Sequence, residues 1–596
     1  MELNNLYGLI NRGVQKYNHL PAMVHKSKGQ WARISWDELK TKVHQIAQGL
    51  IELGLNKSNT VCLLSNTRVE WSMIDLGILA DGGITVPIYP SSVASQCEFI
   101  INDSEARFIF VENEEQLKKV LEIRARTPNL IKIITITEGI PGSNLVLTLE
   151  ELIELGSNKH EKELVKRISD LQPSDIATFV YTSGTTGVPK GTVLTHESFL
   201  AGVYGSTKSL PSLEGLETIN FLPLCHVLGR ENSFIHMYSG TVQWYAESFD
   251  KLGENIREAK PHFFSAVPRV FEKAFNKISD KVENKGPRAV RLFNWSIQVG
   301  REVSQHLQNK ERIPFNLKWK YLIAKRLVFN KIHKGFGGRL EFVVSGGAPL
   351  SRKLSELFHA VGILILEGYG LTETCSATHV NQRDNFRFGT VGLPIDGIEA
   401  KLADDNEILV RGKSIMLGYY KNEKLTKEAL SPEGWYHTED IGEIDSEGFL
   451  KIVDRKKDLI VTSGGKNVAP QYIENLLKSS PYISECLVYG DKRNFLSALI
   501  VPDEERTRAW ARKNNITCKT FGALIRKKEI IQFIEKEIED IGQDIASYQR
   551  VKKFALLDKE FTEAAGEITP SLKLKRSVII KKHQKLLDQF YENRYN

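Results

Sequence analysis

The stretch FVYTSGTTGVPKGTVLTH, residues 179–196, combines residue types that hold phosphate groups. Its glycines let the backbone approach a ligand closely, its threonine and serine side chains donate hydrogen bonds, and Lys190 supplies a positive charge. The spacing differs from that of the Walker loop, in which four residues separate a glycine from Gly-Lys-Ser/Thr. Here two residues separate Gly184 from Gly187, and Lys190 is followed by Gly191. The stretch therefore predicts a phosphate-binding loop of another kind.

Four further stretches carry residues that suit an ATP site. SGGAPLS (345–351) follows the strand-like LEFVV, and we expect it to open a helix whose first N–H groups attract anions. EGYGLTETC (367–375) is expected to follow another strand, and it offers Tyr369 for stacking and Glu373 as an oxygen ligand for Mg²⁺. WYHTEDIG carries Asp440, an acceptor for ribose hydroxyls, and DRKKDLIVTSGGKN carries Arg455 and a glycine turn. Together these stretches predict a nucleotide site built from several segments.

In this order, the five stretches resemble the motifs of the AMP-forming adenylate superfamily, which includes acyl-CoA synthetases, luciferases and the adenylation domains of peptide synthetases. The resemblance runs from about residue 30 to the lysine motif near residue 573. Within the superfamily, the segments WARISWDEL, VPIYPSS, PLCHVLGR, VPRVFEK and GEITPSLKLKR are similar to bacterial long-chain fatty acid CoA ligases. The resemblance therefore implies a ligase that joins an acid to a thiol.

The resemblance also implies roles for single residues of these motifs. The β- and γ-phosphates are expected to contact Thr182, Ser183, Gly184, Thr185, Thr186, Gly187 and Lys190. Adenine and the acyl carboxylate are expected to lie among Gly346, Gly347, Ala348, Gly368, Tyr369 and Gly370. Thr372 is expected to contact the α-phosphate and Glu373 to bind Mg²⁺. Asp440 and Arg455 are expected to hold the ribose.

Two further residues admit both a functional and a structural interpretation. Lys573 in TPSLKLKR matches a mobile lysine that bridges carboxylate and phosphate during adenylation, yet it also lies in a basic run typical of a solvated surface. His226 in PLCHVLGR matches a position beside the bound carboxylate, yet a histidine in such a loop also forms local hydrogen bonds. Cys225 and Cys375 flank the motifs without a neighbouring base, so we expect both to pack in the core.

One position departs from the pattern of several relatives. These carry a lysine at the end of the DRxKxLIx segment that serves the thioester step, whereas this sequence has Val461. The glycine turn SGGKN (463–467), with Gly464 and Gly465, is then the candidate for presenting backbone to the pantetheine arm of coenzyme A.

The implied reaction has two steps. A fatty acid carboxylate attacks the α-phosphorus of ATP, with Mg²⁺ present, and gives acyl-AMP and pyrophosphate; the coenzyme A thiol then displaces AMP. Fixed cations and hydrogen-bond donors lower the first barrier because two anions must meet. A close alternative is a fatty acyl-AMP ligase that delivers its acyl group to a carrier protein, although the insertion typical of such relatives is not evident around VDRKKDLIV. The other alternative is a non-catalytic lipid- or nucleotide-binding protein on the same fold, but Lys190, Glu373 and Lys573 are all present.

The bulk properties agree with a cytoplasmic enzyme. The chain has 596 residues, 41% hydrophobic and 26% charged, and a net charge of +7, which is too modest at this length to indicate nucleic acid. The six cysteines are scattered without metal-ligand spacing, which favours free thiols in a reducing compartment. The N-terminus lacks the pattern of a signal peptide, and no run approaches the ~20 apolar residues of a membrane span.

The pattern of apolar segments predicts an α/β fold. Short buried runs such as TVCLLS, ITVPIYP and ATFVYTS alternate with helical segments such as 34–53, which is typical of a layered α/β domain. After about residue 385, short strands with Gly and Asp turns predict β-hairpins. We expect a large N-terminal domain over residues 1–453 and a small mobile α+β lid over 454–596, with a hinge at 454–456. In the lid, Ile531, Ile534, Ile538 and Ile541 predict a core-facing helical stripe.

Residues 285–334 are rich in lysine and arginine, with aromatic residues between them. A basic amphipathic region of this kind can lie on an anionic membrane surface, at the inner face of the cell membrane in this case. The alternative is a solvated helical hairpin whose aromatic side chains pack inward, and charge runs are more often of this kind.

Overall fold

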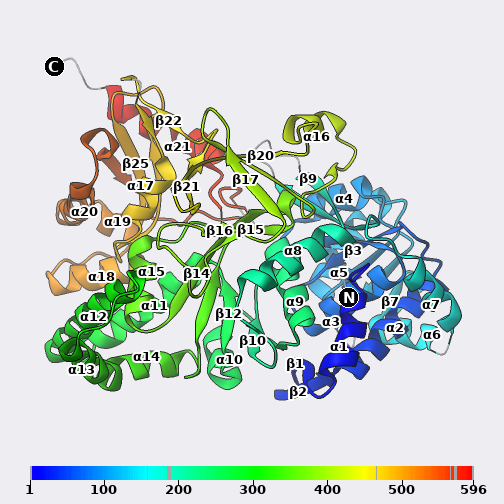
Figure 1. Ribbon diagram of the computed structural model, residues 1–596. Helices are drawn as coiled ribbons and strands as arrows, with labels where there is room; N and C mark the ends of the chain where they lie inside the picture. Colours follow the sequence, from blue (N-terminus) through cyan, green and yellow to red (C-terminus); the bar gives the residue numbers. More distant parts are fainter. Residues whose placement is uncertain are drawn as a thin grey trace.

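The computed structural model describes residues 3–137, 140, 142–157, 159–183, 189–464, 466–563, 565–569 and 573–592. Its larger part contains two mostly parallel sheets of eight and nine strands, with helices between them and on both outer faces (Figure 1). This arrangement is the layered α/β fold that the alternating segments predict.

The eight-stranded sheet has the order β19-β9-β8-β4-β3-β5-β6-β7. Its strands are β3 (Thr60–Leu64), β4 (Ile84–Ile88), β5 (Phe108–Val111), β6 (Lys132–Thr135), β7 (Val146–Thr148), β8 (Ile176–Ser183), β9 (Pro189–Thr195) and β19 (Gly418–Tyr419). Successive side chains of β3 point to opposite faces: Leu63 enters the central core, whereas Cys62 and Leu64 pack with the outer helices α4 (Ala94–Asp103) and α5 (Glu114–Ile123). The uninterrupted apolar runs are therefore explained by burial on both faces.

The nine-stranded sheet has the order β16-β15-β14-β13-β12-β10-β11-β1-β2. Its strands are β1 (Pro21–Ser27), β2 (Gln30–Ser35), β10 (Glu217–Asn220), β11 (Val242–Tyr245), β12 (Phe263–Ala266), β13 (Phe342–Ser345), β14 (Leu364–Leu371), β15 (Ser376–Val380) and β16 (Leu393–Pro394). The outer face is covered by α10 (Leu252–Ala259), α11 (Pro268–Glu283), α12 (Pro287–Gln308), α13 (Phe315–Ala324), α14 (Asn330–Gly335) and α15 (Arg352–Ala360). Other helices of this part, outside the central layer, are α1 (Gly8–Tyr17), α6 (Leu149–Gly156), α7 (Glu161–Asp170) and α16 (Glu423–Ala429).

The central layer between the sheets contains α2 (Trp36–Glu52), α3 (Val69–Ala80), α8 (His196–Ser209) and α9 (Val227–Ser239). A helix between two sheets must be apolar on all sides, and every residue of α3 except Glu70 is buried. Asp75 of α3 is nevertheless charged, and it forms a salt bridge of 2.5 Å with Arg230 of α9, with both side chains 1% exposed. This pair joins the two central helices at a point where either charge alone would be costly.

The predicted hairpins form a four-stranded antiparallel sheet of β17 (Ile398–Leu402), β18 (Glu407–Gly412), β20 (Tyr436–Ile444) and β21 (Leu450–Arg455). After β21 the chain enters the C-terminal part, which lies at the upper left of Figure 1. Its strands are β22 (Ile460–Val461), β23 (Asn467–Val468), β24 (Ile483–Tyr489), β25 (Leu496–Pro502) and β26 (Val551–Leu556). Its helices are α17 (Pro470–Leu477), α18 (Glu504–Lys513), α19 (Phe521–Ile525), α20 (Lys528–Ile541) and α21 (Arg576–Glu592).

Three local expectations need correction. SGGAPLS does not itself open a helix, because α15 begins only at Arg352 and the two glycines lie in the preceding loop. EGYGL does not follow a strand but forms the end of β14, since Gly368 and Tyr369 pair with β15. In α20 the buried stripe is Ile530, Ile534 and Ile538, whereas Ile531 is 39% exposed.

The aromatic residues of the basic region divide into two groups. Phe293, Trp295 and Tyr321 pack against the core cluster on the outer face of the nine-stranded sheet, as the solvated-hairpin interpretation requires. Phe315 and Trp319 do not, because they are 77% and 57% exposed. No helix among the described residues combines the length and the apolarity that crossing a membrane requires. Cys225 and Cys375 are buried free thiols, as expected, and burial raises the pKa of both.

Candidate active site

A cavity of about 60 Å³ opens between the ends of β13 and β14 and the first turns of α9. Gly346, Gly347, Gly368, Tyr369 and Gly370 line it, together with His226. The carboxyl ends of neighbouring parallel strands meet at one edge of a sheet, which explains why motifs distant in sequence converge here. Gly370 has no substitute, because a Cβ atom at this position would lie 1.6 Å from the carbonyl oxygen of Ser376.

Asp440 is the centre of a polar group beside this cavity. The hydroxyl of Tyr369 donates to its carboxylate at 2.6 Å, and the Nε atom of Arg455 lies 3.1 Å from the other oxygen. Asp440 and Arg455 are also paired across β20 and β21. Burial raises the pKa of Asp440, while Arg455, Tyr369 and Lys573 act in the opposite direction. The hairpin sheet thus holds one carboxylate and one guanidinium side by side.

Glu373 forms a second polar group with residues of the β9 edge. The hydroxyl of Tyr419 donates to its carboxylate at 2.9 Å, and the Nζ atom of Lys190 lies 5.2 Å from the centre of the Tyr419 ring. Thr372 is buried in the short turn before Glu373. Lys190 and Glu373 therefore both lie close to Tyr419, the lysine at its ring and the glutamate at its hydroxyl.

Lys573 comes from the C-terminal part and lies within electrostatic range of both polar groups. Loss of surrounding water and the charge of Arg455 lower the pKa of its ammonium group, whereas Asp440 and Glu373 raise it. The Lys573 side chain is nevertheless exposed to solvent, so it is not packed in a core. The structure thus combines both interpretations, because this lysine of a basic run is exposed and also lies near the carboxylates of the site.

His226 begins α9 and combines two features. Its Nδ1 atom accepts a hydrogen bond from the N–H of Leu228 at 3.2 Å, so the local bond that the sequence allows is present. The half-buried ring also lines the cavity, where burial and then Lys573 lower its pKa to about 4. The imidazole is therefore neutral at physiological pH, and its contact with substrate stays a prediction.

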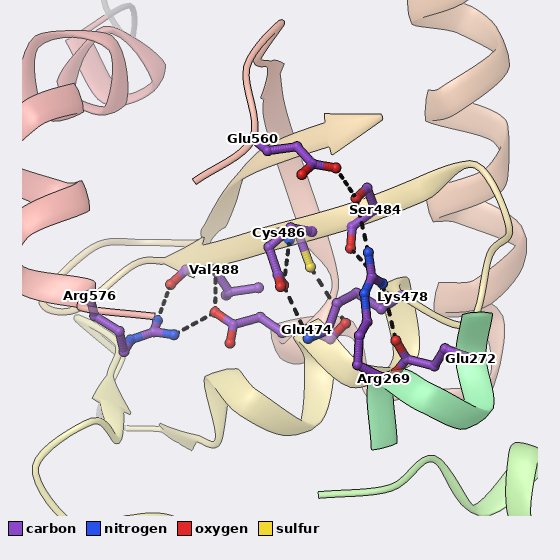
Figure 2. A network of polar contacts seen from close by, with 10 residues as sticks. Arg269, Glu272, Glu474, Lys478, Ser484, Cys486, Val488, Glu560 and Arg576 are labelled. Carbon is purple, nitrogen blue, oxygen red and sulfur yellow. Dashed lines mark hydrogen bonds and ion pairs between the residues drawn. The ribbon is translucent and has the colours of Figure 1, made fainter. Parts of the chain in front are cut away.

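Helix α11 connects the larger part to the C-terminal part. Arg269 donates to the backbone oxygen and to the hydroxyl of Ser484, each at 3.4 Å, and pairs with Glu272 (Figure 2). Further along the helix, Arg506 donates to Asp280 at 2.6 Å. These contacts stabilise the orientation in which Lys573 faces Asp440.

Several predicted residues are not brought to this cleft. Ala348 does not line the cavity, and the turn that contains Gly464 is hydrogen-bonded to residues 492–494. Gly184, Thr185, Thr186, Gly187 and Gly465 lie outside the described residues, as does the side chain of Ser183. Thr182, the last residue but one of β8, is paired with Lys190 of β9.

The sequence prediction missed two residues that contribute to the site. Tyr419 in MLGYY belongs to no quoted motif, and only the antiparallel pairing of β19 with β9 brings it next to Lys190. Glu231 lies five residues beyond His226, lines the same cavity and is 1% exposed. A spacing of five residues does not place two side chains on one face of a helix, so the sequence offers no signal for Glu231.

Comparison with known proteins agrees with this geometry. Residues 10–420 match the family "AMP-binding enzyme", and residues 457–595 match "AMP-binding enzyme C-terminal domain". The long-chain-fatty-acid–CoA ligase FadD15 of Mycobacterium bovis is 36% identical, over 94% of this chain and 93% of its own length. The long-chain-fatty-acid–CoA ligase ACSBG2 of Xenopus laevis is 31% identical, over 99% of this chain and 84% of its own.

Solved structures give the same fold. The anthranilate CoA ligase AuaEII in complex with anthranoyl-AMP superposes with a TM-score of 0.75 at 21% identity, over 99% of both chains. The adenylation domain of a carboxylate reductase from Mycobacterium chelonae superposes with a TM-score of 0.78 at 20% identity, over 99% of this chain and 91% of that domain. The matches cover nearly the whole sequence, and the chain belongs to the AMP-binding enzyme family.

Proposed function

We propose that this protein is a long-chain fatty acid CoA ligase. The observation that carries the proposal is the proximity of Lys573 to Asp440, Arg455 and Glu373, next to a cavity that Tyr369 and one side of α9 line. A cleft with cations and a carboxylate at its mouth suits the meeting of ATP with an acid. The activity printed in the names of FadD15 and ACSBG2 supports the same assignment.

In the first step, a carboxylate oxygen forms a bond to the α-phosphorus of ATP, and the bond to pyrophosphate breaks. Lys573 neutralises charge between the two anions, Lys190 and the residue 182–187 loop hold the departing pyrophosphate, and Thr372 donates to the α-phosphate. In the second step, the coenzyme A sulfur bonds to the acyl carbon, AMP leaves with the electron pair, and the thiol proton passes to solvent. We propose that backbone at Gly464 and Gly465 guides the pantetheine arm.

Mg²⁺ fits the residues around Glu373. No cluster of three or more metal-ligating side chains occurs in the part of the chain that the structure describes, and Mg²⁺ characteristically takes one or two carboxylates together with phosphates and water. Glu373 supplies one such carboxylate, and this carboxylate also accepts a hydrogen bond from the Tyr419 hydroxyl. When bound, the ion would neutralise phosphate charge.

We also propose that residues 1–453 and 454–596 act as a body and a lid. Lys456 donates its N–H to Glu439 at 2.7 Å and its ammonium group to Glu407 at 3.0 Å, which keeps the chain attached to the hairpin sheet up to this residue. Rotation of the lid about residues near 454–456 would withdraw Lys573 after the first step.

Pyrophosphate release across a panel of carboxylic acids, with and without coenzyme A, tests the function. Long-chain fatty acids should support release, and acyl-CoA should accumulate only when coenzyme A is present. Release with aromatic or amino acids alone would overturn the proposal. Transfer to a carrier protein but not to coenzyme A would identify the acyl-AMP ligase, and binding without release would identify the non-catalytic alternative.

A peripheral membrane contact through α13 is part of the proposal. The exposed side chains Phe315, Trp319, Leu322, Ile323 and Leu327 follow helical spacing, and each is at least 42% exposed. From Arg312 to Lys334 the chain has seven lysines and arginines and no acidic residue. An apolar stripe with an unopposed positive charge complements an anionic lipid surface.

Vesicle co-sedimentation tests this contact. Binding to phosphatidylglycerol vesicles should weaken with salt, because exposed charges are screened within ~10 Å at 0.1 M. Trp319→Ala should reduce binding. Val93→Ala should not, because Val93 is an apolar residue of similar exposure that lies before α4, next to the eight-stranded sheet. Absent binding, or self-association that Trp319→Ala abolishes, would overturn the membrane assignment.

A further inference from the structure

The inner wall of the cavity is lined by one side of α9. Beyond His226, the lining residues are Val227 and Leu228, then Glu231 and Asn232, then Ile235 and His236. With a rise of 1.5 Å per residue, Glu231 lies roughly 7 Å and His236 roughly 15 Å along the helix from His226. An acyl chain whose carboxylate lies at the cavity mouth would therefore pass its middle portion along these polar side chains.

Polar atoms of α9, β13 and α8 around this cavity are buried without partners. Glu231 Oε1, Asn232 Nδ2, His236 Nδ1, Ser345 Oγ and Ser206 Oγ form no hydrogen bond with any described residue. Each of these atoms is fully shielded, and four of the five side chains are at most 4% exposed. A buried polar atom without a partner costs ~1–3 kcal/mol, and most such atoms in proteins are paired. Five of them adjoin one cavity, so an acyl chain that widens the cavity on binding brings either its carbons or a polar group of its own against them.

Two of these residues, Asn232 and His236, also line a second cavity. Asn232, His236 and Ser265 line both the cavity of about 60 Å³ and a smaller cavity of about 10 Å³, which continues toward Phe221 and Leu222. The polar side chains therefore lie partway along the path, not at its end. An unsubstituted alkyl chain would have to cover all of these groups without satisfying any of them.

The protonation states match a neutral oxygen ligand. Burial raises the pKa of Glu231 to about 8, opposed by the Ser376 hydroxyl and the Ala377 N–H, and burial lowers the pKa of His236 to about 3. Glu231 is thus a neutral acid that can both donate and accept, and His236 is a neutral imidazole. Asn232 Nδ2 only donates, so its partner must be an acceptor.

We propose that the acyl pocket selects fatty acids that bear an oxygen substituent, hydroxyl or oxo, in the middle of the chain, and that Asn232, His236 and Glu231 bind this oxygen. The proposal rests on the proposed ligase function and names its substrate class. It assigns Ile235, which lines the same cavity between these polar residues, to contact with the alkyl carbons.

The test compares kcat/KM for acyl-CoA formation with octadecanoic, 10-hydroxyoctadecanoic and 10-oxooctadecanoic acid. One or two hydrogen bonds predict a preference for an oxygenated acid of about 10-fold. Asn232→Leu and His236→Phe should each reduce this preference and increase the rate with octadecanoic acid, whereas Ile235→Leu should leave the preference unchanged. A hydroxyl preference without an oxo preference would indicate that Glu231 accepts; the reverse would indicate that Asn232 donates.

Equal kcat/KM for all three acids in the wild-type protein would overturn this inference and leave the ligase function intact. A preference that persists in both Asn232→Leu and His236→Phe would also overturn it. If none of the acids releases pyrophosphate, the proposed function itself fails. Since a buried substitution can unfold the protein, direct binding of the acids to each variant with a wild-type Tm provides the second measurement.

Discussion

Arg576, which lies three residues after Lys573, donates to the buried carboxylate of Glu474 at 2.5 Å (Figure 2). The same guanidinium donates to the backbone oxygen of Val488 at 2.5 Å, and Glu474 accepts from the Val488 N–H at 2.7 Å. The start of α21 is thus fixed to α17 and β24. This pair positions the segment that carries Lys573.

Arg576→Leu should weaken the C-terminal part by about 3–5 kcal/mol, because it leaves the Glu474 charge buried and unpaired. Amide hydrogen exchange in β24 and α17 should accelerate by about two to three orders of magnitude. The double variant Arg576→Leu/Glu474→Gln should recover most of this protection, since glutamine still accepts from Val488 without a charge. Equal exchange in the single and double variants would show that the ion pair is not responsible.

Lys573→Ala should reduce adenylation by orders of magnitude, since in the proposed first step this ammonium group neutralises charge between the two anions. Thioester formation from supplied acyl-AMP and coenzyme A should stay close to the wild-type rate. Pyrophosphate release reports the first step, and single-turnover thioester formation reports the second. Lys585→Ala, an exposed lysine of α21, is the matched control and should alter neither. If Lys573→Ala slows both steps equally, the two-orientation mechanism is wrong for this protein.

Glu231→Gln should change how stability depends on pH. The folded pKa of Glu231 is about 8 and that of an unfolded glutamate is about 4.3, so between these values the folded state binds one proton more. Wild-type stability contributed by this group is therefore present below about pH 4.3 and is lost as pH rises toward 8. The Tm of the variant relative to wild type should rise between pH 5 and pH 8, measured by differential scanning fluorimetry. A pH-independent difference would exclude a neutral Glu231.

Asp280→Arg should disfavour the orientation in which α11 contacts the C-terminal part, because it replaces the partner of Arg506 with a like charge. Asp280 is 47% exposed, so solvent screening limits the effect to a several-fold decrease in adenylation. Combining Asp280→Arg with Arg506→Asp should restore the rate by reversing the pair. Failure of the double variant to recover, with unchanged Tm, would argue against this contact as an orientation lock.

Glu373→Gln keeps a hydrogen-bond acceptor for Tyr419 but removes the anionic Mg²⁺ ligand. Adenylation should fall by at least 10-fold and be partly restored by a higher Mg²⁺ concentration, while fatty acid binding without ATP is retained. The two readouts are pyrophosphate release over a Mg²⁺ titration and fluorescent fatty acid binding. Parallel loss of both would assign Glu373 a structural role.

The sequence predicted the layers well because burial on both faces leaves a strong local signal. The runs of β3, β4 and β8 are mostly apolar, and their threonines Thr60, Thr85 and Thr178 are buried, so the runs do not alternate as surface strands do. Boundaries were weaker where long-range pairing decides them: β14 continues through Gly368 and Gly370, which local propensity assigns to a loop, because β15 pairs alongside.

The site followed the same rule. Asp440, Arg455 and Glu373 occur in recognisable segments, so their convergence could be expected. Tyr419 depends on the pairing of β19 with β9, and the unpartnered atoms of Asn232 and His236 become apparent only once the cavity is known. The outward orientation of Trp319 could not be judged from spacing, since an apolar helical stripe looks the same whether it faces the core or the solvent.

Among the described residues, each hydrophobic cluster draws its members entirely from before or entirely from after Lys456. The chain therefore completes the interior of its larger part while the last segments are still on the ribosome, on the order of ten seconds before release at typical elongation rates. The C-terminal part then folds next to a larger part whose sheets are already complete, so its strands do not compete for pairing with strands of that part. Vectorial synthesis thus separates the two folding problems, and truncated chains released near this residue should accumulate as native-like nucleotide-binding bodies rather than as aggregates.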